Sequence, residues 1–119
     1  MTTVAFFRSP EYGLIGFEAS GHSDFADEGE DIVCAAVSAL TQAALGGLTS
    51  VVKAPVMFDQ DQENAFLTVC LTPDCTREQL EKAQILLDTL YGAIQAIAGD
   101  YPRNVRTIFK ERRKYTCSA

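Results

Sequence analysis

The run from Ile32 to Val52 contains no charged residue, and it limits what this chain can fold into more than any other feature. An acidic segment comes before it, and the change to apolar residues is abrupt at Asp31. Aspartate is a favoured N-cap, so the pattern predicts a helix that begins after Asp31 and is apolar nearly all round. In a small domain such a helix needs cover on several sides, and we expect part of it to come from a second copy of the chain.

The same run is long enough to cross a bilayer, for which about 20 apolar residues suffice. Its composition argues against that placement, because it is rich in small residues and lacks flanking basic anchors and aromatic belts. It also carries polar side chains at Ser38, Thr41, Gln42, Thr49 and Ser50. We therefore expect a helix of the protein core and no membrane association.

Along the sequence, five strand-like runs flank this helix and a second expected helix. The fifth run lies near the C-terminus. The expected strands cover residues 2–8, 14–20, 55–58, 65–72 and 104–109, where β-branched and aromatic residues gather between turn signals. Thr76 to Gln79 has the form of a capping box, and a stripe of apolar residues spaced three and four apart follows it. Gly99 is the expected residue just past the end of this helix, before Pro102.

This order, β-β-α-β-β-α-β, predicts one α+β domain over residues 1–119. Two hairpins and a closing strand form one mixed β-sheet, and two helices cover it in a two-layer arrangement. The chain is too short for a second core.

Cys34 and His22 are the strongest candidates for catalytic residues. If Asp31 is the N-cap, Cys34 lies in the first turn, where free backbone N–H groups and the helix dipole favour the thiolate, the nucleophilic form. His22 is the only histidine in the chain, and it follows Gly21 at the end of an expected strand. A cysteine with a nearby imidazole forms a nucleophile and general-base pair.

The sequence GH, a loop and then DIVCAAVSAL resembles the ribosomal-processing cysteine protease family, Prp. The resemblance covers essentially the whole chain. It implies that His22 and Cys34 are the catalytic pair, with Gly21, Asp31 and Ser38 around them. It also implies a homodimer, and a protease that removes a short N-terminal extension from large-subunit ribosomal protein twenty-seven. That extension is apolar and ends in an aromatic residue, and the mature protein begins with a basic segment.

The charges narrow the classes of partner. With 10 Lys+Arg against 16 Asp+Glu, the formal charge is −6, which disfavours direct nucleic-acid binding as the main task. Acidic residues crowd the loop between His22 and Cys34, where they form either a rim that attracts a basic, extended peptide or an ordinary solvated loop. The candidate substrate-binding residues in this loop, which we expect to act as a lid, are Asp24, Phe25, Asp27, Glu28 and Glu30.

The cysteines favour a cytoplasmic protein with reduced thiols. No secretory signal is recognisable before the first strand-like run, so paired disulfides among Cys34, Cys70, Cys75 and Cys117 are not expected. Nor do we expect a metal or a cofactor, since one histidine and loosely spaced cysteines do not form a zinc motif and no CxxC redox motif occurs. The competing hypothesis is a non-catalytic, ribosome-associated binding or assembly factor.

Overall fold

The computed structural model describes residues 1–21 and 28–112, and describes side chains for residues 1–21 and 32–112. The elements follow the predicted order, with a short π-helical segment, η1, after the first helix. Their bounds are β1 Thr2–Ser9, β2 Gly13–Ser20, α1 Glu28–Gly46, η1 Gly47–Val51, β3 Val56–Asp61, β4 Phe66–Leu71, α2 Arg77–Asp100 and β5 Val105–Glu111.

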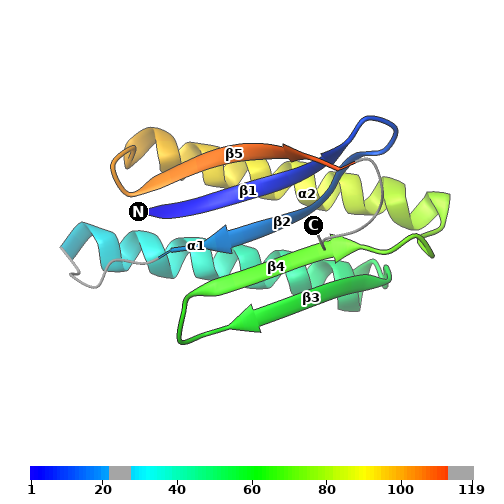
Figure 1. Ribbon diagram of the computed structural model, residues 1–119, viewed down its shortest axis with the longest axis horizontal. Coiled ribbons are helices and arrows are strands. Elements are labelled where there is room, and N and C mark those ends of the chain that lie inside the picture. The colour runs from blue at the N-terminus through cyan, green and yellow to red at the C-terminus, as the bar shows by residue number, and fades with distance from the viewer. Residues whose placement is uncertain (22–27, 113–119) are drawn as a thin grey trace.

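The five strands form one sheet in the order β3-β4-β2-β1-β5. Neighbouring strands are antiparallel except β1 and β5, which are parallel, so the sheet is mixed. Figure 1 shows both helices on the same face of this sheet, α1 behind β2 and β4 and α2 behind β1 and β5. The predicted two-layer α+β architecture is therefore confirmed.

Pairing on both sides makes β1 an interior strand of the sheet, between β2 and β5. Residues Thr3 to Ser9 are opposite β2, and Thr2 to Arg8 are opposite β5. At its first residue, the backbone N–H of Thr2 donates to the carbonyl of Asn104 at 2.8 Å. The start of β1 is thus held by the final strand, far away in sequence, and this matters for the candidate site.

The core lies between the sheet and the two helices. Phe6, Phe17 and Val69 occupy equivalent positions on three adjacent strands, and each is fully buried. Phe6 also meets the ring of Tyr91 on α2 edge to face, with centroids 5.1 Å apart. α1 and η1 share one buried stripe that packs on this core, with its residues spaced three and four apart. The stripe consists of Val33, Val37, Thr41, Ala44 and Leu48.

The predicted start of the first helix and the predicted end of the second helix were wrong. Because α1 begins at Glu28, Asp31 lies inside its first turn and is not the N-cap. Acidic residues in a first turn suit the positive end of the helix dipole, so the same sequence signal fits a start four residues earlier. α2 continues through Gly99 to Asp100, and the N–H of Tyr101 caps it by donating to the carbonyl of Ile97 at 2.8 Å.

The end of the uncharged run, η1, is a π-helix at the place where it meets α2. A Cβ built on Gly47, the first residue of η1, would lie 2.8 Å from Cδ1 of Leu86 on α2. A glycine here therefore lets the segment approach α2 closely, and a larger residue would require the Leu86 side chain to shift.

Within one chain the uncharged run is covered by the sheet and by α2, and part of it stays exposed. The window Ile32–Val51 has a mean hydropathy of 1.6, enough by length and composition to cross a membrane, and 28% of it is buried inside the domain. Because it packs on the sheet as a core helix does, this is weak evidence for a membrane span. Its outer face instead leaves apolar side chains in solvent, with Ile32 68% and Val51 79% exposed.

Replacing Thr76 by alanine should lower the free energy of unfolding by about 1 kcal/mol. The predicted capping box is present: Thr76 Oγ1 accepts from the N–H of Gln79 at 3.1 Å, and Gln79 Oε1 accepts from the N–H of Thr76 at 2.9 Å. Urea denaturation measures the loss. Thr89→Ala is the matched control, because this exposed hydroxyl donates only to the carbonyl of Ile85 within α2. An equal loss in both variants would contradict a capping effect.

Candidate active site

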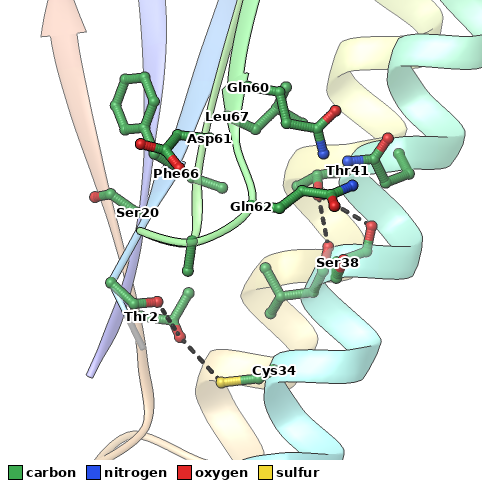
Figure 2. Close-up of a pocket in the computed structure, with 15 residues that line it drawn as sticks. Thr2, Ser20, Cys34, Ser38, Thr41, Gln60, Asp61, Gln62, Phe66 and Leu67 are labelled. Carbon is green, nitrogen blue, oxygen red and sulfur yellow. Dashed lines mark hydrogen bonds between the residues drawn. The ribbon is translucent and has the colours of Figure 1, made fainter. Parts of the chain in front are cut away.

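A cavity of about 380 Å³ opens between α1 and the ends of four strands. Its walls come from the start of β1, the end of β2, one face of α1 and the tip of the β3–β4 hairpin. Figure 2 shows side chains from all of these elements converging on it. Such a concave space with both apolar and polar walls is the usual form of a ligand site.

Cys34 lies at one end of this cavity, on the α1 wall. Cys34 follows Val33, which belongs to the buried stripe. The rotation of the helix from one residue to the next therefore turns the Cys34 side chain away from the core and toward the margin of the sheet, where it is half-buried. Its Sγ lies 3.6 Å from Oγ1 of Thr2. The thiol is therefore accessible from the cavity while one side of it is held against the sheet.

Thr2 and Gly21 form the strand side of the site. Thr2 Oγ1 donates to the carbonyl of Gly21 at 3.4 Å, so one hydroxyl contacts both Cys34 and the end of β2 (Figure 2). Gly21 has a φ of +93°, and a Cβ on it would lie 2.5 Å from the carbonyl oxygen of Met1. Only glycine fits this backbone, which fixes the direction in which the chain leaves β2 toward His22.

Ser38 and Thr41 continue the α1 wall beyond Cys34. The hydroxyl of Thr41 donates to the carbonyls of Val37 and Ser38, at 2.9 and 3.2 Å, and so belongs to the helix. Ser38 is exposed and lies one turn after Cys34 on the same face, as predicted.

The hairpin tip supplies the opposite wall with a negative charge at Asp61. Its two carboxylate oxygens accept from the side chain and the backbone N–H of Asn64, at 2.6 and 3.2 Å. These bonds, the side-chain bond first, lower the pKa of Asp61 below its usual value of 3.8, so the group is ionised at neutral pH. The apolar part of the wall is Ala65, Phe66 and Leu67.

The chain matches the protein-family model for cysteine protease Prp over residues 1–106. It is 28% identical over 99 residues to the ribosomal processing cysteine protease Prp of Bacillus subtilis, covering 83% of this chain and 88% of that protein. It is 30% identical over 113 residues to the protein of the same name in Staphylococcus aureus, covering 92% of this chain and all of that one.

This chain belongs to the Prp family of cysteine proteases.

Solved structures agree with the fold of this Prp-family domain. The crystal structure of SMU.848 from Streptococcus mutans superposes with a TM-score of 0.81 at 26% identity, covering 94% of this chain and 96% of that one. The Prp protease from S. aureus in complex with a substrate peptide superposes with a TM-score of 0.79 at 23% identity, covering 92% of this chain and all of that one.

The described part of the structure brings together three of the predicted site residues: Cys34, Ser38 and Gly21 line one cavity. His22, Asp24, Phe25 and Asp27 lie outside the described residues. Glu28, Glu30 and Asp31 lie in the first turn of α1, at the Cys34 end of the cavity, and their side chains are not among those described.

The prediction that Cys34 lies in the first helical turn was wrong. It is the seventh residue of a helix that begins at Glu28. In an α-helix only the first four N–H groups are free, and later ones bond to the carbonyl four residues back. The backbone N–H of Cys34 is therefore not an available oxyanion donor, and the free amides of the helix start do not surround its sulfur.

Sequence reasoning missed the residues that face Cys34 from the sheet and the hairpin. Thr2 was seen only as part of a strand, and Gln60, Asp61 and Gln62 only as part of a polar turn, although β3 extends to Asp61. Nothing in their local pattern signals a site, because strand pairing far away in sequence brings them there. Among the described residues, no group of three or more His, Cys, Asp and Glu is placed to hold a metal ion.

Replacing Gly21 by alanine should destabilise the protein by at least about 1–2 kcal/mol, because the left-handed backbone is strained for any side chain and its Cβ would meet the carbonyl of Met1. Thermal unfolding measures this loss. Gly92→Ala is the control, since a Cβ on this helical glycine meets nothing within 4 Å and should stabilise by about 0.5–1 kcal/mol. A Gly21→Ala variant as stable as the parent would refute the strain argument.

Proposed function

We propose that this Prp-family chain is a cysteine endopeptidase in which Cys34 is the nucleophile and His22 the general base. The supporting observation is the half-buried thiol at the end of a cavity large enough for several substrate side chains. A crystal structure of the S. aureus Prp protease with a covalently linked product peptide, 24% identical to this chain, is consistent with covalent catalysis in the family.

In the proposed reaction His22 removes the thiol proton, and Sγ of Cys34 attacks the carbonyl carbon of the scissile peptide bond. The tetrahedral adduct collapses when His22 returns the proton to the leaving amine, which departs and leaves a thioester on Cys34. A water molecule, deprotonated by His22, then attacks the thioester and releases the carboxylate product and the thiol. The oxyanion donors in this scheme come from cavity groups other than the Cys34 amide.

The proposed substrate is the N-terminal extension of large-subunit ribosomal protein twenty-seven. Relatives in B. subtilis and S. aureus carry the name ribosomal processing protease, which points to a ribosomal protein. The cavity has an apolar wall at Ala65, Phe66 and Leu67, suited to the apolar side of such a cleavage site. The ionised Asp61 adds a negative charge to the acidic residues 24–30, suited to its basic side.

We further propose that the active form is a cytoplasmic homodimer. Unfolded or newly made ribosomal protein is found in the cytoplasm, where free thiols such as that of Cys34 persist. The outer face of α1 and η1 carries apolar or small side chains that the single chain leaves exposed, and a second copy is the occupant that would cover them. These residues are Ile32, Ala35, Ala39, Ala43 and Val51.

Cys34→Ala should abolish cleavage, whereas alanine at Cys70, Cys75 and Cys117 together should leave it within a few-fold of the parent. Cys70 is buried and is not among the residues that line the cavity, and burial raises the pKa of the Cys75 thiol, which disfavours its thiolate. The assay mixes enzyme with the extended ribosomal protein and measures product masses. A single cut at the extension boundary is expected. Undiminished turnover by Cys34→Ala would end the proposal, and cuts scattered through unrelated unfolded proteins would overturn the substrate.

Raising the salt concentration from 0.1 to 1 M should lower kcat/KM for the basic substrate, because the Debye length falls from about 10 Å to about 3 Å. Neutralising the carboxylates at Asp24, Asp27, Glu28 and Glu30 to amides should reduce this salt dependence. Asp61→Asn, made separately, measures how much of the salt dependence comes from the carboxylate on the hairpin wall. A salt dependence equal in parent and neutralised enzymes would contradict electrostatic steering by this loop.

Ala43→Glu should convert the protein to a monomer at micromolar concentration, because it places a charge in the middle of the exposed face of α1. Sedimentation equilibrium distinguishes the two states. Ala96→Glu is the matched control, since this alanine is exposed on α2, away from the outer face of α1, and should leave the dimer intact. A parent protein that sediments as a monomer would refute the dimer outright.

A further inference from the structure

The hydroxyl of Thr2 is the polar group of the sheet that lies against the sulfur of Cys34. Its Oγ1 is 3.6 Å from Sγ and 3.4 Å from the carbonyl oxygen of Gly21. The residue is 5% exposed, so solvent is largely absent from this contact. One side chain therefore joins the start of β1, the end of β2 and the candidate nucleophile on α1 (Figure 2).

A hydroxyl has one proton to donate and two lone pairs to accept with. While Cys34 is a thiol, Thr2 donates to the Gly21 carbonyl, and the S–H is able to donate to Oγ1. When Cys34 loses its proton, rotation about the C–O bond of Thr2 directs the hydroxyl proton at the sulfur. A bond to an ionised partner is stronger than one to a neutral carbonyl, so the thiolate favours this second arrangement.

We propose that Thr2 is a positioning residue that donates a hydrogen bond to the Cys34 thiolate and holds the sulfur at the end of the cavity. This inference rests on the proposed role of Cys34 as the nucleophile. With the Cys34 amide occupied inside α1 and the helix start six residues away, a donor from the sheet provides stabilisation that the helix does not.

The backbone around Thr2 makes this donor rigid before any substrate binds. Its N–H is bonded to the carbonyl of Asn104, and it is paired with Val105 of β5. The neighbouring Thr3 points to the opposite face of the sheet, where its Oγ1 accepts from Nε of Arg106 at 3.0 Å. Thr3 thus offers the same side chain, one residue away, without contact to the cavity.

A Thr2 variant leaves every charged group around the site unchanged, including the proposed base His22 and the acidic residues in the first turn of α1. Among the described residues that line the cavity, Asp61 is the only titratable group besides Cys34, and its carboxylate is bonded to Asn64. Asp61 stays ionised above acidic pH, because those bonds lower its pKa, so its charge is constant where a thiol titrates. A change in the titration of Cys34 on altering Thr2 is then attributable to the hydroxyl.

The test is the rate of alkylation by iodoacetamide as a function of pH, in the full chain. The fast-reacting thiol is assigned to Cys34 by its loss in Cys34→Ala. Thr2→Val removes the hydroxyl at constant shape and should raise the midpoint of the pH–rate profile by about one pH unit. Thr2→Ser keeps the hydroxyl and should retain the parent midpoint, as should Thr3→Val. Circular dichroism confirms folding, and Thr2→Ala replaces Thr2→Val if the latter does not fold.

A folded Thr2→Val variant with the parent midpoint would overturn the inference while leaving Cys34 as the nucleophile. So would a Thr2→Ser variant shifted as far as Thr2→Val, because that result assigns the effect to packing. A parent protein in which Cys34 shows no fast alkylation would overturn both this inference and the proposed function.

Discussion

The packing of one stripe of α1 against the sheet determines where everything else in the site lies. Val33 and Val37 are each 2% exposed, and they fix the rotation of the helix about its axis. With that rotation set, Cys34 is turned by about 100° from Val33, out of the core and toward the sheet margin. Its thiol then meets the first residue of β1, and the space between helix and hairpin becomes the cavity.

The cavity follows from the uneven cover of the sheet. Two helices lie over a five-stranded sheet, and the edge strand β3 is left almost entirely exposed. The hairpin tip therefore stands beside α1 without packing on it, and a trough remains between them. The cavity has an apolar wall and the ionised Asp61. A cleavage site with an apolar side and a basic side requires both of these properties.

Elements with strong local patterns were predictable from the sequence. The capping box at Thr76 and the strand-like run at residues 65–72 depend on residues a few positions apart, and both are confirmed, the second as β4. The start of α1 was misplaced because Asp31 is as well suited to a first turn as to a cap, and Gly99 did not end α2 because glycine is also tolerated within a helix. Thr2 was not predictable at all, since the pairing of β1 with β5 determines its position beside Cys34.

The central claim is that the sulfur of Cys34 forms a covalent bond with the substrate carbonyl. A peptide aldehyde with the sequence of the apolar extension places an electrophilic carbon where the scissile carbonyl lies, and addition of the thiol gives a thiohemiacetal. The deciding measurement is carbon-13 NMR of the complex, with the aldehyde carbon labelled. The account predicts that the aldehyde signal is replaced by a thiohemiacetal signal in the parent protein and in the variant lacking the other three cysteines, and that it persists in Cys34→Ala. A thiohemiacetal that forms equally in Cys34→Ala, or none in the parent at saturating aldehyde, would contradict it.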